Sequence, residues 1–173
     1  MRSKTIIPKI AVPIISRSKE EILADAECIS SSCADAAEWR VDFYEDMNDH
    51  EKTVSLAHEI RRILNGKQFL FTCRTSAEGG EAEITSADYR ELLFEAVAGR
   101  CADMIDAEID TAKVFMKDLV SKAKSQGIAI VISHHNFKET PDRSRILNKF
   151  KEMNESGGDI LKVAVMPNCR ADV

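Results

Sequence analysis

The chain has 173 residues, which is enough for one domain with a substantial core. Its composition, 44% hydrophobic and 31% charged, is typical of a soluble globular protein. The net charge of −5 argues against a general nucleic-acid surface, and no apolar run approaches the ~18 residues of a membrane span. We therefore expect a single domain over residues 1–173 that binds neither nucleic acid nor membrane.

The N-terminus and the cysteines both indicate a cytoplasmic protein. Residues 1–7 carry charge, but they lack the long apolar segment and the small-residue cleavage site that a secretion signal would have. The five cysteines form no CxxC pair and leave one without a partner, which is typical of reduced thiols.

Hydrophobic periodicity predicts strands and helices in strict alternation. Ser18 is a candidate N-cap, and Asn65-Gly66, Gly99 and Gly127 are candidate helix ends. The expected strands are 9–15, 36–43, 67–73, 102–108, 128–133 and 159–167, and the expected helices are 18–30, 49–64, 86–98, 111–126 and a segment within 141–156. This order implies a parallel sheet with right-handed crossovers.

Two architectures have this order: an open doubly wound sheet and a (β/α)₈ barrel. The first strand-to-helix turn has no Gly-rich phosphate loop, which argues against a dinucleotide-binding sheet. Ionisable residues instead lie on or just after the carboxyl ends of consecutive strands: Glu38, Arg40, Asp42, Arg74, Asp106, Glu108, His134, His135 and Lys162. In a barrel these strand ends meet at one mouth, where the active site lies. We therefore predict an α/β chain with the barrel architecture.

The length constrains this prediction. A complete barrel of this class has eight strands and about 200 to 250 residues or more, whereas six strands are predicted here. We expect the sequence to cover about the first six β/α units and to lack the last quarter of the barrel.

Lys162 is out of place in its strand, the apolar stretch DILKVAVMP of residues 159–167. We expect this strand to be fully buried, with Lys162, Ala164 and Met166 on one face. A poorly solvated lysine has a lowered pKa and can serve as a Schiff-base nucleophile. The alternative is an edge-strand lysine whose ammonium reaches water.

Further charged residues are placed to bind a polar substrate. Glu38, Arg40 and Asp42 alternate with apolar residues and share one face, Arg74 follows an apolar strand, and Glu78 lies in a Gly-rich loop. A solvated strand face and an ordinary turn are the alternatives.

His134 and His135 follow another apolar strand. Adjacent side chains on an extended backbone point to opposite sides, and no HxxxH spacing accompanies them, so we do not expect a zinc site. One histidine acting as general acid and base fits better, because its pKa lies near neutrality.

Four segments carry a family resemblance: EWRVD (38–42), TCRTSAEGGE (72–81), SHHNFKETP (133–141) and DILKVAVMP (159–167). Together they resemble type I 3-dehydroquinate dehydratase, the Schiff-base class of the shikimate pathway of aromatic amino acid biosynthesis. The resemblance implies a (β/α)₈ barrel, usually a homodimer, that dehydrates 3-dehydroquinate to 3-dehydroshikimate without metal or organic cofactor.

The resemblance also implies a role for each matching residue. Lys162 would form the imine, His135 would be the general acid and base, and Glu78 would orient it. Glu38, Arg40 and Arg74 would hold the substrate, and His134 would have a flanking role.

The family's last two strands supply a carboxylate-binding arginine, and a serine and a glutamine on a closing loop, none of which has a counterpart in these 173 residues. Two alternatives to the dehydratase therefore stay open: a non-catalytic barrel remnant acting as a binding or assembly unit, and another class I lyase such as an aldolase.

Overall fold

Six parallel strands form one sheet in the order β1-β2-β3-β4-β5-β6, with a helix in each of the five connections. The computed structural model describes residues 8–172. The elements are β1 (Ala11–Ile14), α1 (Lys19–Ser30), β2 (Ala36–Arg40), α2 (His50–Leu64), β3 (Gln68–Thr72), α3 (Ser86–Gly99), β4 (Met104–Glu108), α4 (Met116–Gln126), β5 (Ala129–Asn136), α5 (Arg143–Glu155) and β6 (Ile160–Val165). Short 3₁₀ turns cover Val41–Phe43 (η1), Ser76–Glu78 (η2) and Arg170–Asp172 (η3).

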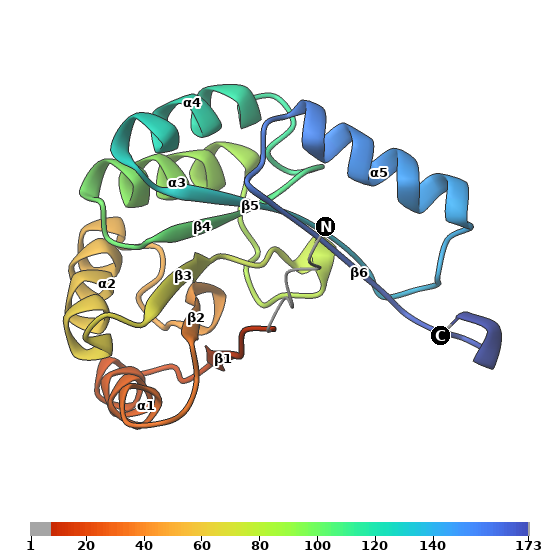
Figure 1. Cartoon of the computed structure of the whole chain (residues 1–173). Helices are drawn as coiled ribbons and strands as arrows, with labels where there is room; N and C mark the ends of the chain where they lie inside the picture. The colour runs from red at the N-terminus through yellow and green to blue at the C-terminus, as the bar shows by residue number, and fades with distance from the viewer. Residues whose placement is uncertain (1–7, 173) are drawn as a thin grey trace, which may run out of the picture.

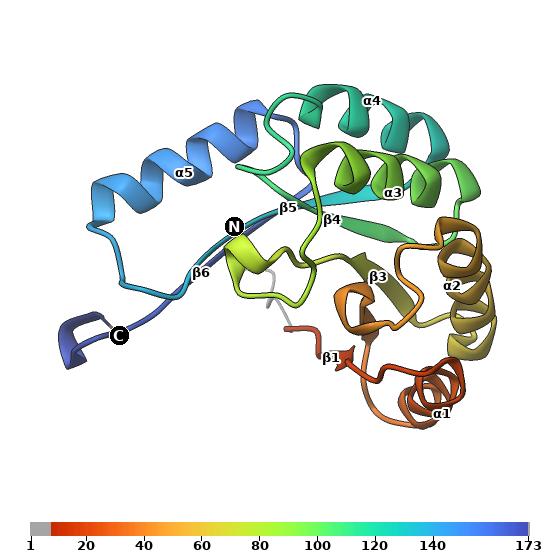
Figure 2. The ribbon, with the colours of Figure 1, turned by 180° about the vertical axis from the view of Figure 1, so that it is seen from behind.

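The sheet is curved as part of a barrel (Figures 1 and 2). Each strand pairs with the next one along the chain, without the reversal of order that a doubly wound sheet has. Glu38 on β2 and Lys162 on β6 are four strands apart, which is about 19 Å in a flat sheet. Their Oε1 and Nζ atoms are nevertheless 3.7 Å apart. The prediction of a partial barrel over an open sheet is confirmed.

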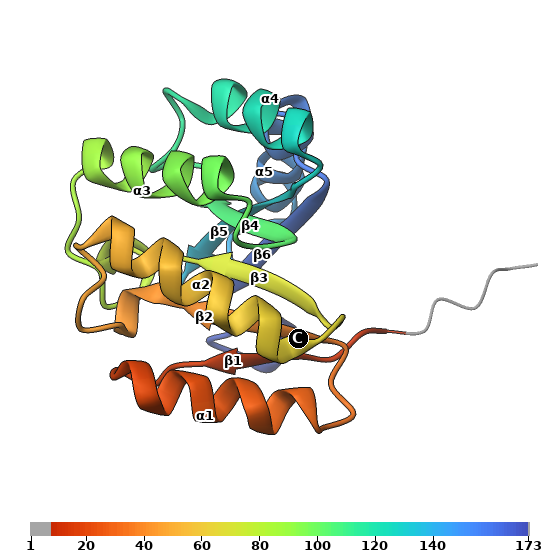
Figure 3. The same cartoon turned by 90° about the vertical axis from the view of Figure 1, so that its left-hand side faces the viewer.

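The core lies between the convex side of the sheet and the helices, which follow one another around it (Figure 3). Trp39 on β2 packs edge-on against Phe71 on β3, and both side chains are buried. Leu56 and Ile60 of α2 and Leu92 of α3 are buried in the same core. The outer face of the strands is therefore apolar, whereas on the inner face the polar groups lie toward the carboxyl ends of the strands, beyond apolar residues such as Leu70 and Val131.

Most predicted helix ends are confirmed. Ser18 forms a capping box with Glu21, and Asn65 and Gly127 end α2 and α4 in the left-handed conformation. Gly99 does not end its helix as predicted, because Arg100 takes the left-handed position with φ 52°. A Cβ on Gly99 would lie 2.8 Å from a methyl group of Val54, so this glycine permits close packing of α3 on α2.

Three element boundaries differ from the prediction by three residues or more. β2 ends at Arg40 rather than at residue 43, because Val41–Phe43 turns to bring the Asp42 carboxylate under the β3–α3 loop. β5 continues through Asn136 because its polar end pairs in register with β6. α4 begins at Met116 rather than at Thr111, whose hydroxyl donates to Glu108.

The expectation that the strand around Lys162 is fully buried is wrong. Every residue of β6 is exposed or half-buried. Within residues 8–172, β6 has a strand partner on one side only, so its other edge is open.

An aspartate directly precedes each of β2, β4 and β6 and accepts a hydrogen bond from the backbone at the start of the preceding strand. Asp35 accepts a hydrogen bond from the Ile10 amide at 2.7 Å, Asp103 from Phe69 at 3.0 Å and Asp159 from Ile130 at 2.9 Å. These carboxylates satisfy amides at the amino ends of the strands, opposite to the mouth.

Within residues 8–172, no helix is long and apolar enough to cross a membrane.

Candidate active site

One pocket at the carboxyl ends of the strands contains all six predicted site residues. It has a volume of about 80 Å³ and is lined by Glu38, Arg40, Arg74, Glu78, Gly79, His135, Phe137 and Lys162. We call it the central pocket. A hollow of about 630 Å³ beside α1 and α2 is larger, but Lys19, Glu59, Lys52 and Asp46 at its wall are paired with one another. The predicted site residues therefore meet in the central pocket and not in this larger hollow.

Lys162 reaches the central pocket from the middle of β6. Strand alternation is as predicted, because Val163 and Val165 face a separate hollow beneath α5. The Lys162 side chain is 39% exposed, and its ammonium lies 3.7 Å from Glu38. Glu38 also accepts a hydrogen bond of 2.9 Å from the Thr72 hydroxyl. The lysine thus has an anionic neighbour and access to solvent.

His135 and Glu78 form a close pair on the inner face. Oε2 of Glu78 lies 3.0 Å from Nδ1 of His135 and accepts a hydrogen bond of 3.1 Å from its backbone amide. This double contact fixes the ring and leaves Nε2 as its other polar atom. The ring also stacks on Phe137, with 6.3 Å between centroids.

The electrostatic surroundings favour a neutral pair. Burial lowers the pKa of His135 to about 4, with further contributions from the positive charges of Arg74 and Lys162. Burial also raises the pKa of Glu78 to about 8, aided by the negative charge of Glu108. Between these pH values both side chains are uncharged, and the neutral imidazole of His135 is available as a base.

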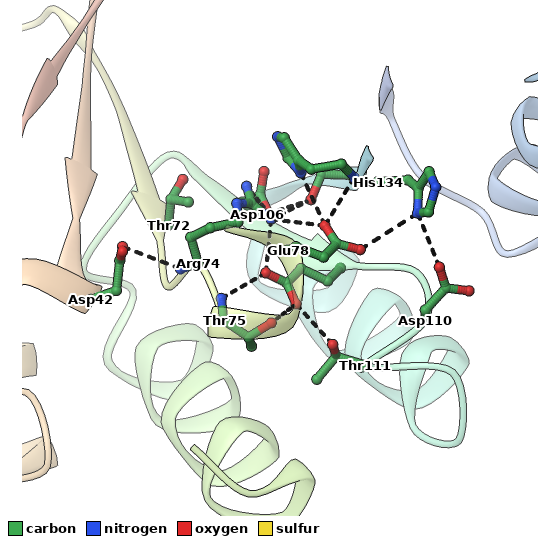
Figure 4. A network of polar contacts seen from close by, with 12 residues as sticks. Asp42, Thr72, Arg74, Thr75, Glu78, Asp106, Asp110, Thr111 and His134 are labelled. Carbon is green, nitrogen blue, oxygen red and sulfur yellow. Dashed lines mark hydrogen bonds and ion pairs between the residues drawn. The ribbon is translucent and has the colours of Figure 1, made fainter. Parts of the chain in front are cut away.

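Arg74 is held in a buried ionic network that the sequence analysis did not assign (Figure 4). Its guanidinium lies 3.0 Å from Asp106 and donates to Glu108 at 3.0 Å. It also donates to the Ser133 hydroxyl at 2.9 Å, and that hydroxyl donates to Asp106 at 2.6 Å. Asp106 and Glu108 are fully buried. Arg74 therefore enters the pocket wall already paired.

The signal for this network was present in the sequence. Asp106 and Glu108 alternate with apolar residues on a buried strand, as inward-facing residues do. Their position at a strand end was recognised, but their joint partner was not, because it comes from another strand.

Asp42 organises the next part of the mouth. Its carboxylate accepts two hydrogen bonds from the Arg40 guanidinium, at 2.8 and 2.7 Å. It also accepts from the backbone amides of Arg74 at 3.2 Å and Glu81 at 3.1 Å. The loop that bears Glu78 is thereby tied to β2.

Two glycines in the same loop are required by close packing. A Cβ on Gly80 would lie 2.1 Å from the Arg74 carbonyl oxygen, and one on Gly79 would lie 2.4 Å from the Phe137 ring. Gly79 also has φ 79°. The close packing of these two glycines therefore holds Glu78 next to His135. The alternative that this loop is an ordinary turn does not account for that packing.

His134 points to the other side of β5, as expected, yet it also meets Glu78. Its Nδ1 lies 3.5 Å from Oε1 of Glu78 and 3.0 Å from Oδ2 of Asp110 (Figure 4). The ligand atoms of Glu78, Asp110 and His134 all lie within 4.8 Å of one another. We call these three residues the outer cluster. Asp110 lies just after β4 and belongs to none of the four segments that carry the family resemblance.

Comparison with known proteins gives a consistent result. Residues 10–173 match the family model for type I 3-dehydroquinase. The chain is 37% identical over 167 residues to the 3-dehydroquinate dehydratase of Bacillus subtilis and 38% identical over 167 residues to that of Clostridium botulinum. In both cases the alignment covers 96% of this chain and 66% of the relative.

Solved structures agree. The 3-dehydroquinate dehydratase of Enterococcus faecalis superposes with a TM-score of 0.93 at 35% identity, over 95% of this chain and 69% of the other. The type I enzyme of Clostridium difficile, solved with covalent modified comenic acid, gives 0.92 at 34% identity, over 95% and 65%. A putative deoxyribose-phosphate aldolase of Toxoplasma gondii gives 0.68 at 13% identity, over 91% and 66%, which shows a likeness of fold alone.

The chain thus spans about 66% of the length of the curated relatives that it matches. Over that span, the family match, the sequence identities and the superpositions point the same way. The chain belongs to the type I 3-dehydroquinase family.

Proposed function

We propose that this chain carries the Schiff-base chemistry that dehydrates 3-dehydroquinate to 3-dehydroshikimate, with Lys162 as the nucleophile. Family membership and the names of its relatives support the reaction. The observation that carries the proposal for the site is the Glu78–His135 contact of 3.0 Å in the same pocket that Lys162 enters.

The first step joins Lys162 to the substrate ketone. The neutral amine attacks the carbonyl carbon to give a carbinolamine, whose hydroxyl takes up a proton and leaves as water, so that a protonated imine forms. In the central pocket, the Nζ atom of Lys162 lies 3.7 Å from the Glu38 carboxylate. Glu38 holds the lysine toward the pocket, and its own anchor on Thr72 keeps it in place.

The second step is the elimination. The imine withdraws electrons from the adjacent carbon, so His135 can remove a proton there and form an enamine. His135 then returns the proton to the departing hydroxyl, which leaves as water, and hydrolysis of the imine frees Lys162. Glu78 is a positioning residue, because it holds Nδ1 and the backbone amide of His135.

Substrate binding is assigned to Glu38, Arg40 and Arg74, which line the same pocket. Arg40 is rigid because Asp42 binds its guanidinium twice, so it presents a fixed positive edge. Arg74 contributes chiefly charge, since Asp106 and Glu108 already occupy it. The proposed reaction uses no metal and no organic cofactor.

Trapping of the imine tests this proposal. Borohydride reduction in the presence of 3-dehydroquinate should add one reduced ligand mass to the protein. The mass should be lost in Lys162→Ala and kept in Lys122→Ala, a matched change of an exposed lysine on α4. Label on another lysine would refute the assignment. No label on any lysine would favour the barrel remnant that binds without turnover.

We also propose that the chain forms one domain and acts as a homodimer in the cytoplasm. A single sheet running through all six strands supports one domain, and five unpaired cysteines support a reducing compartment. Family likeness supports the dimer. Light scattering after gel filtration and fractionation of the source cells test these statements, and a strict monomer or an exported protein would contradict them.

A further inference from the structure

The outer cluster combines the donor atoms that a zinc ion prefers. Imidazole nitrogen and carboxylate oxygen are ordinary Zn²⁺ ligands at about 2.0 to 2.2 Å, which places tetrahedral ligand atoms about 3.3 to 3.6 Å apart. His134 Nδ1 lies 3.5 Å from the Glu78 oxygen and 3.0 Å from the Asp110 oxygen. The Glu78 and Asp110 oxygens lie within 4.8 Å of each other, and Asp110 is exposed, so its side chain is free to move toward Glu78 around an ion.

Two of these atoms are buried without a hydrogen-bond partner among the described residues. They are Oε1 of Glu78 and Nδ1 of His134. The Glu78 side chain is only 7% exposed, so Oε1 has little access to bulk water. Burial of an unsatisfied carboxyl oxygen is unfavourable, and a bound cation would offset that cost. The oxygen points toward His134 (Figure 4).

The neighbouring cations do not occupy the ligand atoms. Arg74 lies 3.5 Å from the other oxygen of Glu78, Oε2, which also contacts His135. Lys149 lies 3.0 Å from the other oxygen of Asp110, Oδ1, and also donates to Glu152. Each carboxylate is thus held by one oxygen and presents the second one to His134.

We propose that Glu78, Asp110 and His134 bind one Zn²⁺ ion, with water completing its coordination. Through Glu78 this site is connected to the acid-base pair of the proposed function. Zn²⁺ on Oε1 would withdraw electron density from the carboxylate and weaken its hold on His135 through Oε2. The ion would therefore slow dehydration while leaving Lys162 free to form its imine.

Zinc titration by calorimetry tests the site without relying on activity. The protein should be the whole chain with Cys28, Cys33 and Cys169 changed to serine, because exposed thiols would bind the metal themselves. We expect one Zn²⁺ per chain. His134→Ala and Asp110→Asn should each weaken binding about tenfold or more, and His58→Ala, a change of an exposed histidine on α2, should not.

Nitrogen NMR on the same samples gives a second readout. Zn²⁺ should shift the Nδ1 resonance of His134 as a directly bound atom and the His135 resonances as a neighbour, and leave His58 unchanged. Absence of saturable binding, or equal binding by His134→Ala, would overturn the proposal. Saturable binding in a chain that fails to trap an imine would refute the proposed function and leave the zinc site standing.

Discussion

Glu78 divides its two carboxylate oxygens between two histidines that point to opposite sides of one strand. Oε2 serves His135 inside the central pocket, and Oε1 faces His134 outside it. Sequence reasoning predicted the opposite directions of the two rings, but it did not predict that one loop carboxylate reaches both. Adjacent histidines therefore share a partner, although alternation separates their side chains.

His135 and His134 should differ sharply in kinetic effect. His135→Ala removes the group that transfers protons, so dehydration should fall by about 10²-fold or more. The imine should still be trapped by borohydride, because Lys162 remains. His134→Ala should lower the rate of dehydration much less, when both variants are assayed with a chelator present. A larger loss from His134→Ala would reverse the assignment.

The ionisation of His135 can be measured directly by NMR titration in the presence of a chelator. Burial and the charges of Arg74 and Lys162 lower its pKa to about 4, so the ring should stay neutral as the pH falls from 8 toward 4. In urea the same ring should titrate near the ordinary histidine value of about 6.5. Protonation of the folded-state ring near pH 6.5 would contradict the burial argument.

Periodicity and chain order were enough to predict most of the elements. Alternation placed Glu38, Arg40 and Lys162 on the inner face, and caps such as Ser18 marked helix starts. The boundaries that failed depend on contacts distant in the chain. β2 is cut short by the contact of Asp42 with the β3–α3 loop, and β5 is lengthened by pairing with β6. A local pattern carries no information about such partners.

The aspartate before β6 should contribute measurably to the sheet. Asp159→Ala leaves the Ile130 amide without its acceptor, so the free energy of unfolding should fall by ~1–2 kcal/mol. Glu91→Ala, on the exposed side of α3, should change it by less than about 0.5 kcal/mol. Urea denaturation of both variants provides the measurement. Equal stability of the two variants would show that water replaces the carboxylate at no cost.

At the scale of the whole molecule, the curvature of the sheet brings the site together. Lys162 and Glu38 meet only because β6 curls back toward β2 across the mouth. Within residues 8–172 no strand packs on the open side of β6, and apolar side chains on and near it are exposed, including Ile160 at 47%, Leu147 at 55% and Met166 at 39%. Strand order could be predicted from the sequence, whereas the residues at this open side depend on the three-dimensional path.

The open strand edges should make a chain of residues 1–173 associate with itself. Within residues 8–172, β1 and β6 each have a strand partner on one side only, and an unpaired edge is a template for pairing with another chain. Light scattering should therefore give masses above 19.3 kDa that rise with protein concentration. Ile160→Lys places a charge on the open edge of β6 and should lower the mass, whereas Lys122→Ala on α4 should not. A constant mass of 19.3 kDa at all concentrations would show that the edges are protected within the monomer.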